Sequence, residues 1–363
     1  MNGNVEKIAI VTRNLHSGGA ERVIAQLVNE WSKNGILCYL VLLDKSEIFY
    51  KIDNKVKIIE LGKQSNNLYI NKILIYKMVR ETLIDLKPDI VLSLPEEIGI
   101  YVIMACIGTN LPIVVSERNN PWIMPYKKAS RLIRRISYLF VDGLIFQTDN
   151  AKNFFSRKIR EKGIVLPNPL DLSRIPEPFE GIRKKRIVAA GRLEPQKNFP
   201  LLVEAFGEFV KIHPDYSLSI YGEGSLRDRI QEIINKTGLE QVICLEGNSK
   251  NLLEDIKDAS VFVLSSDYEG VPNVLIEAMA SGIPVVSTDC KPGGAASLID
   301  NYDNGIIVPT NQVHELANAM TYMIEHPNEA AQMSKKAMLI KEKVNSKKVS
   351  SHWLAFLSQC LCK

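Results

Sequence analysis

The chain has 363 residues, which is long enough for two domains with complete hydrophobic cores. Its 46% hydrophobic and 24% charged residues are typical of a soluble globular protein, and its net charge of +4 is too small to indicate nucleic-acid binding. No apolar run approaches the roughly 20 residues of a membrane span, and the N-terminus lacks the layout of a signal peptide. We therefore expect a cytoplasmic protein.

The cysteines are scattered and include no C-x-x-C pair, and no histidine stands at metal-ligand spacing. This pattern predicts reduced and mostly buried thiols and no metal site. The six cysteines are Cys38, Cys106, Cys244, Cys290, Cys360 and Cys362.

The first half alternates short apolar runs with helical segments, which predicts a parallel α/β sheet. The expected strands are residues 8–12, 36–43, 57–61, 90–94, 113–116, 143–147 and 164–166. The expected helices are residues 20–33, 68–86, 98–107 and 150–159.

Two adjacent glycines, Gly18 and Gly19, follow the first expected strand and open its helix. A right-handed crossover would place this loop at the carboxyl edge of the sheet, where open α/β folds bind ligands. Asp44 closes the second strand about where a dinucleotide fold keeps its ribose-binding acid, but the glycine pattern is not G-x-G-x-x-G. A dehydrogenase is therefore a third alternative, and a plain strand-to-helix turn also explains the glycines.

A basic segment over residues 126–140 carries the most one-sided charge in the chain. At helical spacing its basic residues gather near one side and its apolar residues supply another. Such a helix can lie on an anionic membrane, where each basic residue contributes about 1 kcal/mol, or bind a diphosphate. A solvated face on a helix that packs against the core is the alternative. The basic residues are Lys127, Lys128, Arg131, Arg134 and Arg135.

The proline-rich, polar stretch that begins at Pro167 interrupts the alternation, which predicts a domain boundary near residue 170 and a cleft at this hinge. The pattern then restarts. We expect strands at residues 186–190, 217–221, 242–246, 261–264, 284–288 and 305–308, and helices at 199–212, 225–236, 312–325, 328–344 and 347–361.

Two cations follow the first strand of the second half. Arg192 comes directly after Gly191, and Lys197 precedes Asn198, which can cap the next helix. Arg192 and Lys197 would lie at the carboxyl edge of the new sheet, where they can neutralise a diphosphate leaving group without a metal. Pairing of Arg192 with Glu194 or another surface acid is the alternative.

Two carboxylates bracket the start of a helix after the strand at 261–264. Glu269 precedes Gly270 and Pro272, which open the helix, and Glu277 lies within it. At about 1.5 Å per residue, Glu277 sits roughly 7–8 Å along the axis from Pro272, where it can bind the hydroxyls of a ribose. The alternative is that Glu269 ends a loop and Glu277 is a solvated helix residue.

The same helix start is expected to bind an anion. Its backbone N–H groups would point outward together with the positive end of the helix dipole, an arrangement suited to phosphate. These N–H groups belong to Val271, Asn273 and Val274.

These motifs resemble the donor site of the retaining glycosyltransferase family 4. The resemblance rests on two glutamates separated by seven residues, the Glu-Gly-x-Pro opening, the following Ala-x-Ala-x-Gly-x-Pro-Val-Val, and Gly191-Arg192 with Lys197. It implies the GT-B fold: two Rossmann-like domains, residues 1–170 and 171–345, facing across a cleft, with a helix at 346–363 crossing back to the first domain. The second domain would hold the donor and the first domain the acceptor.

The resemblance also assigns roles. It implies that Gly18 and Gly19 approach the donor diphosphate, that the loop at Asn248 reads the base of a UDP-sugar, and that no metal or other cofactor is needed. Glu117 and Arg118 stand where many relatives keep a histidine on the acceptor side. This version resembles a subgroup that transfers N-acetylgalactosamine or related sugars to lipid-linked glycans.

The implied reaction retains the configuration of the anomeric carbon. The diphosphate departs and one of its oxygens takes the acceptor proton, while Glu269 orients the sugar and Glu277 holds the ribose. The expected partners are a UDP-sugar, a polyprenyl-diphosphate-linked glycan and the anionic inner face of the membrane, with no nucleic acid. A hydrolase or epimerase of the same fold, and a non-catalytic nucleotide-sugar sensor or partner subunit, are the alternatives.

Overall fold

The structure is a computed structural model that describes residues 5–16 and 18–361. The chain divides into two compact units. The first unit comprises Met1–Leu170 with Val344–Lys363, and the second unit comprises Asp171–Lys343. Each unit is built on one parallel sheet, so the expectation of an α/β fold with two Rossmann-like sheets is confirmed.

The sheet of the first unit has seven strands in the order β3-β2-β1-β4-β5-β6-β7. Strands β1, β4, β5 and β6 are buried throughout or nearly so, as expected for a parallel sheet covered on both faces. The strands are β1 (Lys7–Thr12), β2 (Leu37–Leu42), β3 (Lys57–Glu60), β4 (Ile90–Ser93), β5 (Ile113–Ser116), β6 (Gly143–Phe146) and β7 (Gly163–Val165).

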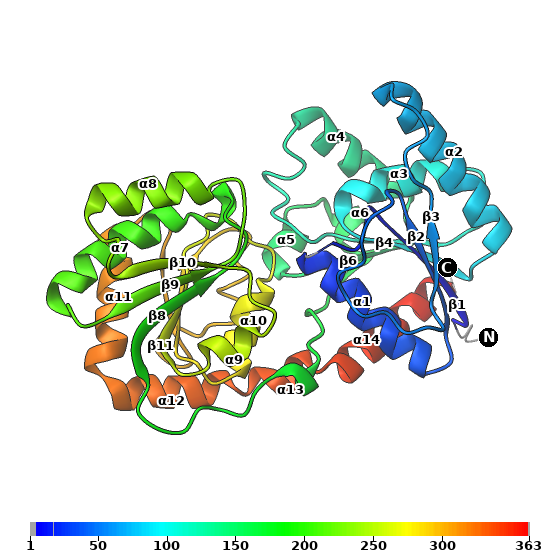
Figure 1. Ribbon diagram of the computed structural model, residues 1–363. Helices are drawn as coiled ribbons and strands as arrows, with labels where there is room; N and C mark the ends of the chain where they lie inside the picture. Colours follow the sequence, from blue (N-terminus) through cyan, green and yellow to red (C-terminus); the bar gives the residue numbers. More distant parts are fainter. Residues whose placement is uncertain (1–4, 17, 362–363) are drawn as a thin grey trace. The chain divides into compact units, whose positions relative to one another are not determined.

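Helices cover both faces of this sheet and form two core layers (Figure 1). One layer joins the sheet to α1 and α14, and the other joins it to α2 and α3. The helices are α1 (Gly19–Lys33), α2 (Leu68–Leu86), α3 (Glu96–Cys106), α4 (Lys128–Ser137), the 3₁₀ turn η1 (Tyr138–Phe140), α5 (Asp149–Asn153), α6 (Arg157–Arg160) and α14 (Ser346–Leu361).

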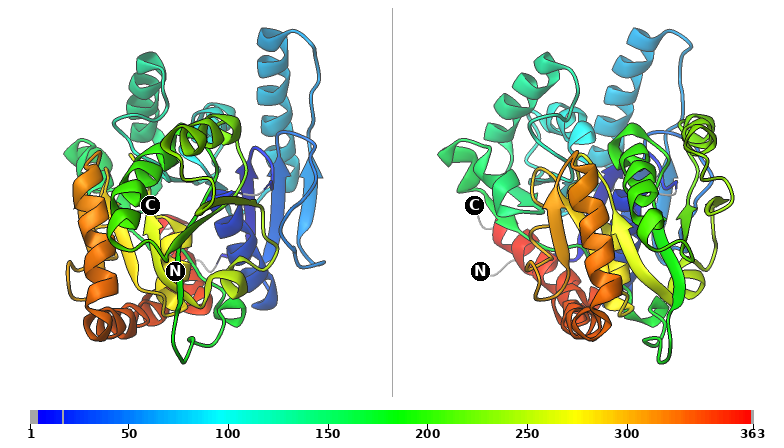
Figure 2. Two further views of the ribbon diagram at one scale, coloured as in Figure 1. Left: turned by 60° about the vertical axis from the view of Figure 1, so that its left-hand side comes forward. Right: turned by 90° about the vertical axis from the view of Figure 1, so that its left-hand side faces the viewer.

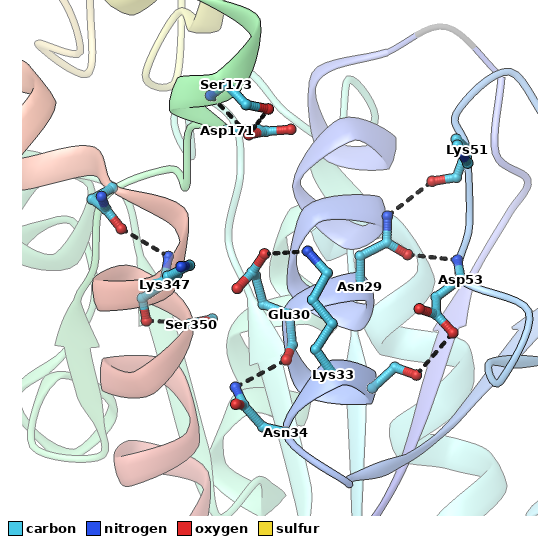
Figure 3. Close-up of polar contacts among 12 residues, drawn as sticks. Asn29, Glu30, Lys33, Asn34, Lys51, Asp53, Asp171, Ser173, Lys347 and Ser350 are labelled. Carbon is cyan, nitrogen blue, oxygen red and sulfur yellow. Dashed lines mark hydrogen bonds and ion pairs between the residues drawn. The ribbon is translucent and has the colours of Figure 1, made fainter.

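The C-terminal helix α14 packs beside α1 within the first unit (Figure 1). Trp353 is fully buried in this layer, and Trp31 of α1 donates its indole N–H to the Ser350 carbonyl at 3.1 Å. The polar side of α1 is fixed separately: Figure 3 shows the Asn29 amide donating to the Lys51 carbonyl and accepting from the Asp53 N–H. The last helix therefore belongs to the core of the first unit.

The sheet of the second unit has six parallel strands in the order β10-β9-β8-β11-β12-β13. The strands are β8 (Lys184–Ala190), β9 (Ser217–Tyr221), β10 (Ile243–Gly247), β11 (Ala259–Leu264), β12 (Val285–Asp289) and β13 (Ile306–Pro309). In both sheets the strand order reverses beside the first strand, between β1 and β4 and between β8 and β11. Open α/β sheets bind ligands at such a reversal, beyond the carboxyl ends of the strands.

In the second unit, α7, α8 and α11 share one core with the sheet, and α9 and α10 lie on its opposite side (Figure 1). The helices are η2 (Leu172–Arg174), η3 (Pro195–Lys197), α7 (Phe199–Ile212), α8 (Arg227–Thr237), α9 (Leu252–Ile256), α10 (Asn273–Ala280), α11 (Val313–Glu325), α12 (Pro327–Ala337) and α13 (Ile340–Val344). No helix in the described ranges combines the length and apolarity needed to cross a bilayer.

Two predicted helices are broken in the structure, and one observed helix was not predicted. The segment 150–159 is broken into α5 and α6 because Phe155 turns into the core and Ser156 starts a new helix. The segment 328–344 is broken after α12, and Leu339 in the break is exposed. The short helix α9 was not predicted, because its single buried residue gives no periodic signal.

Candidate active site

The second unit brings two predicted site loops together at its strand reversal. The loop after β8 carries Arg192 and Lys197, and the loop after β11 carries Glu269. Since β8 and β11 are adjacent and parallel, both loops leave the sheet at the same edge. This is the position at which an α/β sheet of this kind binds a ligand.

Lys197 and Glu269 form a charged pair across these loops. The Lys197 Nζ donates to Glu269 Oε1 at 2.6 Å, and both side chains are largely buried. The Ser266 hydroxyl donates to the same oxygen at 2.9 Å. Glu269 Oε2 makes no hydrogen bond with the described residues, so one carboxylate oxygen is held while the other can accept from a ligand.

Backbone and amide contacts hold the two loops in register. The Asp267 N–H donates to the Gln196 carbonyl at 2.9 Å, and the Gln196 amide donates to the Tyr268 carbonyl at 2.9 Å. Asn198 accepts from the Leu201 N–H as the cap of α7, as predicted, and donates to Asp267 at 2.7 Å. These contacts hold together the two loops that carry Lys197 and Glu269.

Arg192 is exposed in the same loop as Lys197. The alternative that it pairs with Glu194 is wrong, because the Glu194 carboxylate instead accepts from the N–H and hydroxyl of Ser225 at 3.0 and 2.8 Å. Those two hydrogen bonds lower the pKa of Glu194, and the charge of Arg192 adds to the effect. The Arg192 guanidinium makes no ion pair within the described ranges, which leaves it available to a ligand.

Helix α10 begins at Asn273, with Pro272 as its extended N-cap rather than as a first-turn residue. Glu277 is therefore four residues into the helix, about 6 Å along its axis. Glu269 and Glu277 are both largely buried, so the alternative of a solvated Glu277 is wrong. The anion site predicted at Val271, Asn273 and Val274 stays a prediction, and so do the donor-site roles of Gly270 and Pro272.

Three glycines allow the loops of this edge to approach closely. A Cβ on Gly191 would lie 2.9 Å from Lys197 Cε, one on Gly222 would lie 2.0 Å from the Gly191 carbonyl oxygen, and one on Gly294 would lie 1.5 Å from the Gly270 carbonyl oxygen. A glycine pattern in the sequence does not show which backbone segments meet, so these close approaches are evident only from the structure.

Asn248 extends the same edge. It is exposed and directly follows β10, whose last residue, Gly247, accepts the Gly222 N–H at 2.7 Å. The loops after β10, β9, β8 and β11 therefore form one continuous row. The base-reading role of Asn248 stays a prediction.

In the first unit, Gly18 and Gly19 lie at the start of α1. A Cβ on Gly18 would lie 2.1 Å from Glu21 Oε2, because the Glu21 side chain folds back over the helix start. The Tyr50 hydroxyl bonds both the N–H and the carbonyl of Gly18 at 3.1 and 2.9 Å. A larger residue at position 18 would displace the Glu21 side chain. The contact of Gly18 with a donor stays a prediction.

Glu117 lies in a buried polar cluster after β5. Arg134 donates to Glu117 Oε1 at 2.7 Å, and the Tyr138 hydroxyl donates to Oε2 at 2.6 Å. Burial raises the pKa of Glu117 to about 8, although the charge of Arg134 opposes this shift. Since Glu117 is about 1% exposed, the prediction that it faces an acceptor or membrane is wrong.

Arg118 is buried next to this cluster. It donates to the Asn168 side chain at 2.6 Å, and its backbone N–H donates to Glu96 at 3.1 Å. Its Nε and second terminal nitrogen have no hydrogen-bond partner among the described residues. Burial lowers the pKa of Arg118 to about 10, while the charges of Glu96 and Glu21 oppose this shift.

The basic segment differs from its prediction. Arg134 is fully buried, where it also donates to the carbonyls of Met124 and Pro121, so its assignment to a membrane-facing side is wrong. Arg131 is half-buried and donates to the carbonyls of three loop residues, 123, 125 and 126. Lys127, Lys128 and Arg135 are exposed, as predicted.

Comparison with known proteins identifies the family. A model described as Glycosyltransferase Family 4 matches residues 17–174, and one described as Glycosyl transferases group 1 matches residues 176–339, so that together they cover most of the chain. The chain belongs to the family-4 glycosyltransferases. It is an enzyme, and the dehydrogenase alternative based on Asp44 is wrong.

Two relatives match nearly the whole length of this glycosyltransferase. It is 24% identical to a Haemophilus influenzae glycosyltransferase, covering 97% of this chain and 100% of the relative. It is 26% identical to a Campylobacter jejuni GalNAc-α-(1→4)-GalNAc-α-(1→3)-diNAcBac-PP-undecaprenol α-1,4-N-acetyl-D-galactosaminyltransferase, covering 97% and 98%.

The fold is that of solved glycosyltransferases. The crystal structure of Anabaena HepE in complex with UDP and glucose matches with a TM-score of 0.82 at 16% identity, covering 97% of this chain and 99% of HepE. The GT-B fold expected from the sequence is confirmed.

Proposed function

We propose that this glycosyltransferase transfers an N-acetylhexosamine such as GalNAc, or a hexose, from a UDP-sugar to a polyprenyl-diphosphate-linked glycan. Retention at the anomeric carbon, no requirement for a metal, and a place in the synthesis of a bacterial surface polysaccharide or O-antigen belong to the proposal. The observation that carries it is the Lys197–Glu269 pair at the strand reversal of the second sheet. The activity named for the Campylobacter relative supports the choice of sugar and acceptor.

The second unit supplies the groups for a donor. The Lys197 ammonium has three N–H donors, and Glu269 accepts one of them, so the others can bind diphosphate oxygens. Arg192 is exposed at the same edge and can take a second phosphate oxygen. These two cations provide positive charge where other transferases use a metal ion.

In this proposal Glu269 binds the sugar of the donor and Glu277 binds its ribose. Glu269 is anchored through Oε1, so its Oε2 can accept from sugar hydroxyls and orient the ring. Glu277, one turn into α10, accepts from the ribose hydroxyls of a UDP whose diphosphate lies at the helix start. We assign Glu269 no covalent step, because the position of an acid is not by itself evidence for one.

The chemical step follows from this arrangement. The bond from the anomeric carbon to the diphosphate oxygen breaks, which leaves an oxocarbenium-like centre. The acceptor hydroxyl forms its bond on the same face, and its proton goes to the departing phosphate oxygen. Lys197 and Arg192 stabilise the charge that develops on that oxygen, an effect that is typically worth about a hundredfold or more in rate.

A transfer assay tests the proposal. The purified protein is incubated in EDTA with UDP-GalNAc, UDP-GlcNAc, UDP-glucose or UDP-galactose and a short-chain polyprenyl-diphosphate glycan, and mass spectrometry detects the product. We expect one UDP-sugar to be used, with the anomeric proton of the product showing the configuration of the donor in NMR spectra. Inversion, strict dependence on a divalent metal, or turnover of GDP-sugars alone would contradict the proposal.

A further inference from the structure

One exposed sector of α4 is apolar. Of the 19 exposed large apolar side chains in the described ranges, eight lie between residues 122 and 140. Five of these, which we call the apolar patch, lie on α4 and η1: Leu132, Ile133, Ile136, Leu139 and Phe140. Their exposed fractions range from 42% to 69%, so this side of the helix does not pack against the core.

The buried face of α4 is polar, which reverses the usual arrangement. Arg134 and Ser137 point inward, and Arg134 is held there by Glu117 and two backbone carbonyls. At about 100° per residue, Leu132, Ile133 and Ile136 then occupy one continuous sector of the outer face. The buried arginine therefore fixes the rotation of the helix and holds the apolar patch outward.

Basic residues border the apolar patch. Lys127, Lys128 and Arg135, which we call the basic rim, are exposed beside it. The segment 122–140 contains no aspartate or glutamate. An apolar sector flanked by lysine and arginine, without any acid, matches a bilayer of anionic lipid: the apolar chains enter the boundary between headgroups and acyl chains, and the cations bind headgroups.

The apolar surface continues onto neighbouring elements. Ile107, at the end of α3, is 64% exposed and lines the same surface hollow as Phe140. Trp122 and Tyr126, in the loop before α4, are also exposed, and tryptophan and tyrosine favour the interface between lipid and water. In both views of Figure 2 the teal helix α4 lies at the periphery of the first unit.

We infer that the apolar patch and basic rim of α4 and η1 form a membrane-docking surface that inserts into an anionic bilayer. This inference adds a membrane partner to the proposed function. It rests on the proposed function only in the choice of an anionic bilayer as that partner. Docking here would hold the first unit at the surface where a polyprenyl-linked acceptor resides. The mode combines insertion of the apolar patch with attraction of the basic rim to anionic headgroups, and it differs from the purely basic contact expected from the sequence.

Binding to vesicles tests this inference without measuring sugar transfer. The full chain is sedimented with vesicles of phosphatidylcholine containing about 30% phosphatidylglycerol, as the stated probe. We expect Ile133→Gln/Ile136→Gln to reduce the bound fraction about tenfold or more, because about two buried side chains are lost from the bilayer. The matched control is Ile182→Gln/Ile212→Gln, two exposed isoleucines of the second unit, which should bind like the wild type.

Charge and insertion are separated by two further measurements. Lys127→Gln/Lys128→Gln/Arg135→Gln should weaken binding to the anionic vesicles by on the order of a hundredfold and remove its salt dependence. Brominated lipids should quench Trp122, since the two other tryptophans, Trp31 and Trp353, are buried. Thermal unfolding confirms that each variant is folded, and Leu132→Gln/Phe140→Gln replaces any variant that is not.

The outcomes separate the inference from the proposed function. Unchanged vesicle binding in both apolar variants, or no quenching of Trp122, overturns the docking surface whatever the transfer assay shows. A stable dimer in solution that the same apolar substitutions dissociate also overturns it, since a second copy of the chain would then cover the patch. Loss of vesicle binding with transfer to a water-soluble short-chain acceptor retained supports it.

Discussion

Lys197 and Glu269 are 72 residues apart in sequence, and yet their charged atoms lie 2.6 Å apart at the strand reversal of the second sheet. The pair makes the two residues act as one unit: Glu269 holds the ammonium of Lys197 toward the ligand edge, and Lys197 fixes one carboxylate oxygen. Residues that act as a unit lose activity together rather than separately.

Replacing either partner should therefore abolish most of the activity. We expect Lys197→Met and Glu269→Gln each to reduce kcat/KM for sugar transfer by about a hundredfold or more. The double variant should lose little beyond either single variant, because the first substitution already disrupts the pair. Steady-state kinetics measure this, and losses that multiply in the double variant would show that the residues act independently.

The buried Arg134 should be a major source of stability for the first unit. Arg134→Met leaves three acceptors without their donor: the buried Glu117 and the carbonyls of Met124 and Pro121. We expect the free energy of unfolding to fall by about 3–5 kcal/mol. Chemical denaturation measures the loss.

The control for Arg134 is a surface arginine that lies at the same distance from its glutamate partner. Arg157 pairs with Glu161 at 2.7 Å, but both side chains are mostly exposed. Arg157→Met should leave the unfolding free energy nearly unchanged, because exposed ion pairs contribute little. Equal effects of the two substitutions would contradict the role given to burial.

Stability should depend on pH through Glu117. Burial raises its pKa from the ordinary value of 4.5 to about 8 in the folded protein, so the folded state binds the proton more tightly than the unfolded state. This contribution to stability is complete below about pH 4.5 and is lost as the pH rises toward 8. The unfolding free energy of the wild type, compared with that of Glu117→Gln, should therefore decline between about pH 5 and pH 8. If the unfolding free energies of the wild type and Glu117→Gln change in parallel over this pH range, Glu117 does not titrate in it.

The C-terminal helix should be necessary for the stability of the first unit. Trp353 is fully buried against the layer that contains α1. We expect Trp353→Ala to lower the unfolding free energy by about 3–5 kcal/mol, because it leaves a large cavity. His352→Ala, at an exposed neighbouring position, should have little effect in the same denaturation experiment. An unfolding free energy unchanged by Trp353→Ala would contradict this role of α14.

Much of the fold is predictable from the sequence because its strands are continuous apolar runs. The strand predicted at 113–116 and the helix predicted at 68–86 have the same bounds in the structure. The breaks beside Ser156 and after α12 were not predictable, since neither segment contains a glycine or proline that would mark the end of a helix.

The site was predictable in its chemistry but not in its contacts. The sequence indicates Lys197 and Glu269 as functional residues, yet their direct pairing depends on β8 lying next to β11. For α4 the same limit produced an error: a helix with both basic and apolar sectors does not reveal which sector faces inward. The buried carboxyl of Glu117, distant in sequence, decides that Arg134 does.

The most direct test of the donor site is the effect of nucleotides on thermal stability in EDTA. UDP at about a hundredfold excess over its dissociation constant should stabilise the protein by about 2.7 kcal/mol, and GDP, ADP and NADH should not. Glu277→Ala should weaken the UDP effect, whereas Glu240→Ala, at an exposed glutamate of the same unit, should retain it. Stabilisation by NADH, by no nucleotide at all, or by UDP equally in Glu277→Ala would contradict the donor site proposed for the second unit.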